Sequence, residues 1–424
     1  MKMKKIFIIN LLVVLSYFHL SSQNAYKAYE GYYLKQDTYP NDESTFWFQE
    51  NTEVQGVTND GQNWFITVTG HTDISGPSEW GELWKIPKDV PLGINSTSNP
   101  NVESIAMADI PILDANTYWH WGDPDHFNFN GTNYILVPMY PPSGNGIIAC
   151  FKADPFEFIS YTNIPYRPGW CAVDNDGFLY GSPNYASVLW KYEVDWDLLT
   201  SYNNNNYNLL NLISTINLSF TGDSYDELKH MQGGEFSDSD ALLYLVSGSA
   251  GCLWIAADPE PSDGIHVFDT SNWAEIESSI NTNSGFSYFN YTFNNGCSGQ
   301  QSPEGLTIWN LEDGSINEFT GGLHILIFDW NVGGFSGNND HDVSMFHFSH
   351  NIYVDKNNGV EPPSNPLTGT QTNPFQTVND AYNFYPIWDG AQMVIKEGIY
   401  NDTGVYSTRI RMISNGGSAI IGQQ

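Results

Sequence analysis

Basic side chains are scarce in this chain of 424 residues, which has 15 lysines and arginines, 48 aspartates and glutamates, and a formal net charge of −33. A surface of that sign repels phosphate backbones and anionic headgroups. We therefore expect neither nucleic acid nor an anionic membrane as a partner. Polyanionic sugars would need a bridging cation.

Long apolar runs are missing beyond the first twenty residues, and none approaches the roughly 18 residues needed to span a bilayer. We therefore expect no membrane insertion. The early apolar run, residues 6–20, follows three lysines and precedes two serines. That order is typical of a secretory signal peptide. The sequence predicts a signal peptide at residues 1–22 and a secreted protein, extracellular or at the cell surface.

Cysteine is also rare, with four in the chain. In an exported protein, four cysteines suggest disulfides, although three pairings are possible. Proximity in the repeat described next favours Cys150–Cys171 and Cys252–Cys297. Free, buried thiols are the alternative, because Cys171 lies where a small inner-strand residue would fit.

What the chain does have is a divergent repeat, rich in glycine and in aromatic residues, which make up 15% of it. Five stretches start alike. Each continues through a polar turn into an aromatic-rich second run, at residues 63–69, 133–140, 177–182, 242–248 and 323–331. A third run follows each second run, at residues 81–88, 146–153, 187–196, 264–270 and 343–350. The starts are at Gln55, His126, Trp170, Gln232 and Glu304. Repeats of short strands are the signature of a β-propeller. The sequence predicts an all-β protein with a five-bladed β-propeller at residues 28–350.

Turn residues agree with this layout. Asn-Gly or Asp-Gly pairs separate the first and second runs at residues 60–61, 130–131, 176–177 and 313–314. These pairs supply the positive φ of a tight hairpin. Residues 28–36 form a further strand-like segment, which we expect to complete the last blade and so leave no free sheet edge.

The pattern changes near residue 350. Ile352-Tyr353-Val354-Asp355 is followed by Pro374-Phe375-Gln376-Thr377-Val378 and then by Val394-Ile395 and Gly398-Ile399-Tyr400. This stretch resembles the entry of a right-handed parallel β-helix of the pectin-lyase-like superfamily, in which a strand leads to a cap helix and the first coils. The resemblance implies that residues 351–424 begin such a β-helix.

The same resemblance carries no chemistry. The superfamily includes polysaccharide lyases and hydrolases, and also binding and surface proteins. The catalytic residues of its enzymes lie on later coils. One or two coils rarely stand alone, because a solenoid buries its core by stacking repeats. We therefore expect either a longer protein or docking of this segment on the propeller.

The starts of inner strands converge on one mouth of a propeller, where ligands usually bind. The alignment places Gln55, His126, Trp170, Gln232 and Glu304 there in one ring, with His230 just upstream. Amides, imidazoles, an indole and a carboxylate combine hydrogen bonding with an aromatic platform, as sugar recognition requires. Each residue also has a plainer role open to it: His126 could close the pore, Trp170 could wedge two blades apart, and Glu304 could cap a turn.

A glycoside hydrolase or polysaccharide lyase is the alternative, with Glu304, Asp125 and His126 as catalytic candidates, since glycosidases use two carboxylates across the scissile bond. A divalent metal held by His126, His230, Glu304 and Asp125 is a weaker possibility, and no other cofactor is expected. The sequence favours a non-catalytic propeller that recognises an extracellular glycan or a cell-surface partner, alone or as the targeting module of a larger polysaccharide-acting or adhesive protein.

Overall fold

The computed structural model describes residues 34–35, 52–70, 81–90, 99–110, 113, 118, 120–202, 207–220, 225–248, 262–278, 300–309, 311, 322–331, 340–349, 351–359, 374–384, 392–407 and 411–422. The chain divides into two compact units, Lys35–Phe348 and a second one made of Met1–Leu34 with Ser349–Gln424. No helix in the described residues is long and apolar enough to cross a membrane. The predicted signal peptide lies outside these residues.

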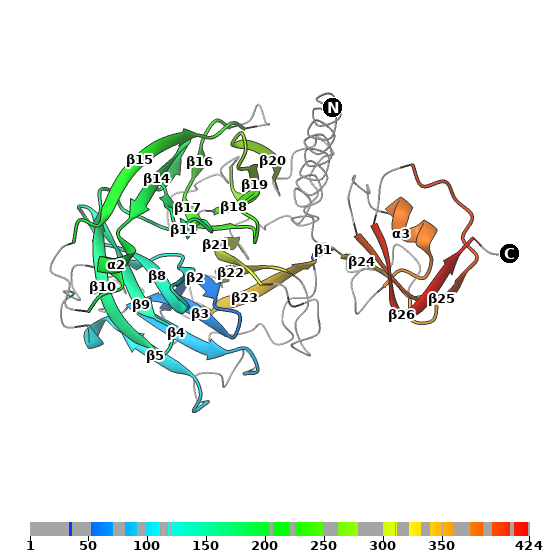
Figure 1. Cartoon of the computed structure of the whole chain (residues 1–424), viewed down its shortest axis with the longest axis horizontal. Coiled ribbons are helices and arrows are strands. Elements are labelled where there is room, and N and C mark those ends of the chain that lie inside the picture. Colours follow the sequence, from blue (N-terminus) through cyan, green and yellow to red (C-terminus); the bar gives the residue numbers. More distant parts are fainter. Residues whose placement is uncertain are drawn as a thin grey trace, which may run out of the picture. The chain divides into compact units, whose positions relative to one another are not determined.

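Five sheets follow one another along the larger unit (Figure 1). The first contains β2 (Thr52–Asn59), β3 (Asn63–Gly70), β4 (Gly81–Pro87) and β5 (Glu103–Ala106). The second contains β6 (His120–Trp121), β7 (Asp125–Phe129), β8 (Thr132–Tyr140), β9 (Gly146–Lys152) and β10 (Glu157–Ile164). The third contains β11 (Ala172–Val173), β12 (Leu179–Gly181), β14 (Val188–Val194) and β15 (Leu210–Asn217).

The fourth sheet contains β17 (Met231–Phe236), β18 (Leu242–Ser247), β19 (Gly264–Asp269) and β20 (Ala274–Ser278). The last contains β21 (Gln300–Ile308), β22 (Leu323–Asn331), β23 (Asp340–Ser349) and β1 (Leu34–Lys35). The remaining elements of this unit are the short pair β13 (Tyr185–Ala186) and β16 (Leu228–Lys229), the one-turn helix α2 (Trp196–Leu199) and the 3₁₀ turn Met107–Asp109.

The protein is all-β with a propeller arrangement of sheets, in which strands are added outward from an inner strand. Four of the sheets are regular four-stranded blades. The second sheet has five strands, because β6 pairs with the far end of β8 beside β7. The structure thus shows four regular blades where the sequence predicts five.

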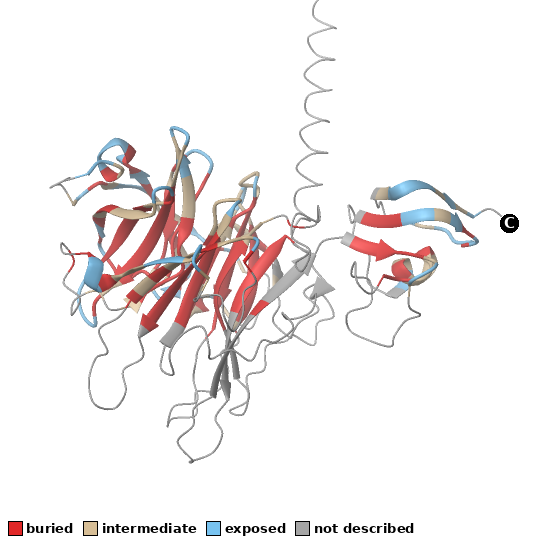
Figure 2. Cartoon of the chain, turned by 90° about the horizontal axis from the view of Figure 1, so that it is seen from below, coloured by how far each residue is buried: buried red, intermediate tan, exposed pale blue. Residues whose placement is uncertain are grey.

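Burial follows the blade pattern. The middle strands β8, β9 and β18 are buried over most of their length, whereas the outermost strands β5 and β15 are largely exposed. Figure 2 shows the buried cores of the strands in red and the exposed loops in pale blue. A strand that a neighbouring sheet covers on both faces has a continuous run of apolar residues. For this reason the second and third runs of the repeat can be recognised in the sequence.

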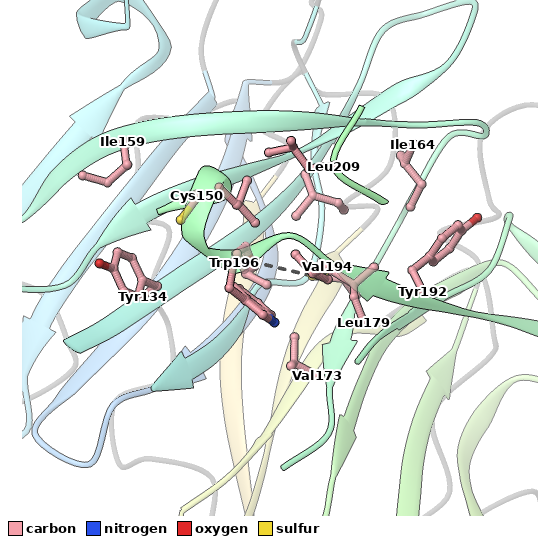
Figure 3. Packing of buried hydrophobic residues seen from close by; sticks show 14 of the residues in the cluster. Tyr134, Cys150, Ile159, Ile164, Val173, Leu179, Tyr192, Val194, Trp196 and Leu209 are labelled. Atoms are coloured by element: carbon pink, nitrogen blue, oxygen red, sulfur yellow. Dashed lines mark hydrogen bonds between the residues drawn. The ribbon is translucent and has the colours of Figure 1, made fainter. Parts of the chain in front are cut away.

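Apolar clusters lie between successive sheets. One packs the second sheet against the third through residues that include Tyr134, Cys150 and Leu179 (Figure 3). Another joins the last sheet to the first through residues that include Ile66 and Leu326. Contact between the last and first sheets is the closure that the repeat predicts. Two of the residues expected to complete the last blade, Leu34 and Lys35, do form its fourth strand.

The predicted disulfide between Cys150 and Cys171 is wrong. Both cysteines are free and buried in the cluster between the second and third sheets, and the Cys171 thiol donates to the Leu136 carbonyl. Burial raises the pKa of both thiols, so neither is a reactive thiolate. Cys252 and Cys297 lie outside the described residues.

The hairpins form where the turn residues predict them. Gly61, Gly131 and Gly177 have φ values of 80°, 81° and 83°. The predicted turn at residues 313–314 lies outside the described part of the chain.

The second unit contains three parallel strands, β24 (Asn351–Val354), β25 (Gln392–Tyr400) and β26 (Arg411–Ile421), and the helix α3 (Val378–Phe384). The Asp402 carboxylate accepts hydrogen bonds from the backbone N–H groups of Val378 and Asn379. A carboxylate at a helix N-terminus satisfies amides that have no partner within the helix. It ties α3 to the segment that follows β25.

Candidate functional site

Three inner strands carry the same irregularity at the same place. The pairing of β2 with β3 skips Gln55, that of β17 with β18 skips Gln232, and that of β21 with β22 skips Glu304. A β-bulge of this kind turns the side chain of the extra residue away from the normal alternation. The three residues therefore occupy equivalent positions in their strands, and each has a long polar side chain.

A glycine follows each bulged residue, and the three glycines surround one carboxylate. A Cβ placed on Gly56 would lie 2.3 Å from Asp123 Cα, and one on Gly233 would lie 2.6 Å from Asp123 Oδ2. A Cβ on Gly305 would lie 2.2 Å from Asp123 Oδ1 and 2.6 Å from Gly56 Cα. Only glycine permits backbone and side chain to approach so closely. We call Asp123 and these three glycines the hub.

Hydrogen bonds tie the hub together. Asp123 Oδ1 accepts from the Val57 N–H at 2.9 Å, and Oδ2 accepts from the Gly234 N–H at 3.1 Å. The Asp123 N–H donates to the Gly169 carbonyl at 2.9 Å, and Asp123 forms a parallel bridge with Trp170. One residue therefore connects the first, third and fourth sheets to the second.

Asp123 is fully buried. Desolvation raises the pKa of its carboxyl well above the ordinary range, against the opposing effect of the two N–H donors. The sequence alone does not single out Asp123. The signal that could have found the hub was the recurrence of a polar residue followed by glycine in three of the five openings.

His126 does not join the bulged residues. It lies further along β7, opposite Ile135, whereas Asp123 stands beside Trp170 at the level of the hub. His126 Nε2 is buried without a hydrogen-bond partner in the described residues, and burial lowers the pKa of the ring. The sequence alignment of the second blade was therefore displaced, because the Gly-Asp-Pro step before β7 has no counterpart in the other blades.

Trp170 cannot be the predicted aromatic platform. Its ring is fully buried, its Nε1–H donates to Ser182 Oγ, and a Cβ on Gly234 would lie 2.5 Å from it. It packs in the apolar cluster between the third and fourth sheets. The plainer role, a wedge between blades, is the one that the structure assigns to it.

The other residues of the predicted site differ in their exposure to solvent. Gln55 and Glu304 are buried, with 6% and 3% of their surfaces exposed, and the Gln55 amide donates to the Val54 carbonyl. Gln232 and His230 are half-buried. His230 has a φ of 55° and lies against the exposed ring of Tyr185 at 5.5 Å. His230 and Gln232 are therefore more accessible than Gln55 and Glu304.

Asp125 is buried beside the hub. Its Oδ1 accepts from the His126 N–H and its Oδ2 from the Val173 N–H, at 2.7 and 2.5 Å. Desolvation raises the pKa of its carboxyl to about 7, and the nearby carboxyl of Asp240 adds to the shift. Burial also raises the pKa of Glu235, and repulsion by the Asp125 carboxylate adds to that shift.

Stability should consequently depend on pH. A raised folded-state pKa means that the folded protein holds a proton that the unfolded chain has released, so the stabilisation is complete below the ordinary aspartate range and is lost as pH rises through about 7. We expect the melting temperature to fall between pH 5 and pH 8, and to fall less in Asp125→Asn, which stays neutral. Calorimetry across this range checks it, and equal pH slopes for the two proteins would contradict it.

A Ser–His–Glu arrangement lies within the fourth sheet. His266 Nδ1 is 2.7 Å from Glu275 Oε1, and its Nε2 is 2.8 Å from the Ser262 carbonyl and 3.3 Å from Ser247 Oγ. The serine hydroxyl donates to the same carbonyl, and His266 and Glu275 are fully buried. Because Nε2 faces a carbonyl acceptor, it cannot take the serine proton, so the arrangement is structural rather than nucleophilic.

Replacing Glu275 should therefore destabilise the fold. Glu275 Oε1 also accepts from the Tyr225 hydroxyl at 2.7 Å, so Glu275→Gln disturbs two buried partners and should lower the free energy of unfolding by about 1–3 kcal/mol. Urea denaturation measures it, with Glu193→Gln, a change at an exposed glutamate, as the control. Equal stability of the two variants would show that the His266–Glu275 contact is dispensable.

The predicted metal ligands do not gather. Among the described residues, no group of three or more His, Cys, Asp or Glu side chains could hold a metal ion. Asp125 and His126 are neighbours on β7, but both carboxylate oxygens of Asp125 already accept backbone hydrogen bonds. His230 and Glu304 do not complete a site with them.

Comparisons with known proteins find similar folds only. No protein-family model and no curated protein matches the chain. CoXyl43, a GH43 β-xylosidase/α-arabinofuranosidase from a compost microbial metagenome, is 13% identical over 74% of this chain and 94% of its own, with a TM-score of 0.40. A GH43 endo-arabinanase from Bacillus licheniformis is 12% identical over 76% of this chain and 97% of its own, with a TM-score of 0.37. A Bacteroides caccae protein of unknown function is 9% identical over 68% and 74%, with a TM-score of 0.33.

Proposed function

We propose that this protein is a secreted propeller that recognises an extracellular glycan at the mouth where the inner strands begin. In this proposal residues 1–22 are a signal peptide, residues 28–350 form a five-bladed β-propeller, and residues 351–424 begin a right-handed parallel β-helix. The propeller would act alone or as the targeting module of a larger polysaccharide-acting or adhesive protein.

One observation carries the glycan proposal. Three inner strands present a long polar side chain on an equivalent bulge, at the residue before a hub glycine. Two amides and a carboxylate arranged in this way offer both donors and acceptors, as sugar hydroxyls require. Bulges that re-aim side chains are frequent next to binding sites. The half-buried His230 and the exposed Tyr185 ring extend the surface.

The five-blade proposal is supported by the order of the sheets. Five of them follow in sequence, and apolar clusters join the first to the second, the second to the third, the third to the fourth and the last to the first. The β-helix proposal is supported by the parallel pairing of β24 with β25 and of β25 with β26. Successive parallel strands joined by longer segments are what the first coils of a solenoid would contain.

A glycan array tests the proposal, with the full chain as the probe. We expect wild type to bind at least one class of oligosaccharide, and Gln232→Ala to weaken that binding because it removes a half-buried amide at the mouth. Glu193→Gln, on the exposed outer part of the third sheet, is the control. An array on which the folded protein binds no glycan would refute carbohydrate recognition.

Hydrolysis is the alternative function, and Glu304→Gln distinguishes it. In a binding site the amide keeps the shape and most of the hydrogen bonding, so affinity should fall only modestly. In a glycoside hydrolase the same change removes a general acid or nucleophile, and turnover should fall by about two orders of magnitude while binding survives. Product analysis on each bound glycan separates the two. Glycan recovered intact after long incubation with wild type favours the binding protein.

A further inference from the structure

The guanidinium of an arginine lies over an aromatic ring of the second sheet. The guanidinium carbon of Arg167 is 4.5 Å from the centroid of the Tyr140 ring, and the His120 ring is 4.3 Å from the same centroid. Arg167 is exposed, and the other two residues are half-buried. The three residues come from β6, from the end of β8 and from the segment before β11. We call them the arginine cluster.

The cluster lies at the end of the sheet where the inner strands begin. His120 pairs with Tyr140 at the last residue of β8, whereas the turn at Asn130 and Gly131 joins β7 and β8 at the opposite end. The Gly146 N–H donates to the carbonyl of Tyr166, which brings Arg167 to the β8–β9 connection. This is the same end of the blades as the bulged residues, because Trp121 exchanges hydrogen bonds with Thr69, the partner of Glu53 in β2.

Arg167 forms no ion pair with any acidic residue in the described part of the chain, whereas Lys85 pairs with Glu103 and Lys191 with Asp174. This is unusual in a chain with 48 aspartates and glutamates. The contact with the Tyr140 ring restrains the guanidinium, while Arg167 as a whole stays exposed. A guanidinium held in this way loses less freedom on binding than a mobile one.

We propose that Arg167 binds the carboxylate of a uronic acid residue carried by an otherwise neutral glycan. The proposal rests on the glycan recognition proposed above and names its ligand class. A planar fork of N–H donors fits a carboxylate with two parallel hydrogen bonds. The net charge of −33 repels a ligand with many anionic groups, so a single carboxylate, paired at short range, fits this surface better than a polyuronate.

Three ligands that differ at one carboxyl test the proposal: a xylo-oligosaccharide bearing one glucuronic acid, its methyl ester, and the unsubstituted oligosaccharide. These join the glycan array, on which other neutral and uronic-acid-bearing pairs are compared. We expect the uronate to bind about tenfold more tightly than its ester, and Arg167→Gln to abolish that difference. Arg167→Lys, which keeps the charge and loses the fork, should recover only part of it. Because Arg167 is exposed, the variants should keep the wild-type melting temperature.

Lys88→Gln is the matched control, since it removes one positive charge at the opposite end of the first sheet, where the Lys88 N–H donates to Gln62. The assignment of Arg167 is overturned if Arg167→Gln keeps the full preference for the uronate over its ester. It is also overturned if Lys88→Gln loses as much of that preference as Arg167→Gln does. Wild-type binding to neutral glycans alone, or better binding to sulfated than to carboxylated partners, overturns the ligand class and leaves glycan recognition standing. Binding to no glycan refutes both proposals.

Discussion

Asp123→Ala is expected to lower the free energy of unfolding by on the order of 2–6 kcal/mol, because it leaves two buried backbone N–H groups without acceptors at about 1–3 kcal/mol each. These groups belong to Val57 and Gly234, in the first and fourth sheets. The loss therefore loosens two blades at once. Asp123→Asn should fall between wild type and Asp123→Ala, since its amide offers only one acceptor oxygen.

Chemical denaturation of the full chain measures this effect. Asp89→Ala is the control, as Asp89 is an exposed aspartate at the end of the first sheet. If Asp123→Ala and Asp89→Ala unfold at the same denaturant concentration, the carboxylate does not hold the blades together. The raised pKa of Asp123 predicts in addition that the difference between wild type and Asp123→Ala grows as the pH is lowered.

Gly305→Ala is expected to destabilise the protein by more than roughly 3 kcal/mol, at the upper end of the cost of overpacking. Its added Cβ would lie 2.2 Å from Asp123 Oδ1 and 2.6 Å from Gly56 Cα. A side-chain oxygen could move, but the Gly56 backbone belongs to a paired strand and can move only with its sheet. In thermal melts, we expect the cooperative unfolding transition of this variant to have a much smaller amplitude than that of the wild type.

Gly61→Ala is the comparison for this variant. Gly61 has a φ of 80° and no atom within 4 Å of an added Cβ, so that change costs only backbone strain, roughly 1–2 kcal/mol. The double variant Gly305→Ala with Asp123→Ala should be less destabilised than the sum of the two single changes, because one of the two clashes disappears. Equal stability of Gly305→Ala and Gly61→Ala would mean that the hub can expand.

Local chemistry made much of the fold predictable. The Asn-Gly and Asp-Gly pairs require positive φ in any context, so their hairpins were identified before the structure. The continuous apolar runs of β8, β9 and β18 marked strands that are covered on both faces. Where prediction failed, the answer depended on contacts between distant residues. Whether β6 adds a fifth strand to the second sheet depends on β8, and nothing in His120-Trp121 alone reveals it.

In the candidate site, too, local patterns could be predicted from the sequence and long-range contacts could not. Gln55, Gln232 and Glu304 share a bulge because a polar residue precedes a glycine in each strand, and that pattern is local. The role of Trp170 is not local, since an indole can stack on a sugar or wedge two sheets apart, and only the packing of its ring decides. Likewise, the sequence alone does not single out Arg167, because its contact with Tyr140 joins segments separated by a whole strand pair.

The hub also bears on how the protein assembles. Asp123 is separated by 66 residues from Val57 and by 111 residues from Gly234, to which it is hydrogen-bonded. Contacts of such long sequence separation form only after the intervening chain has been ordered, which makes them slow to reach. The two amides can thus be protected only in the assembled ring. Their hydrogen exchange should report opening of the whole ring rather than fraying of one sheet, which makes them natural probes of its global unfolding.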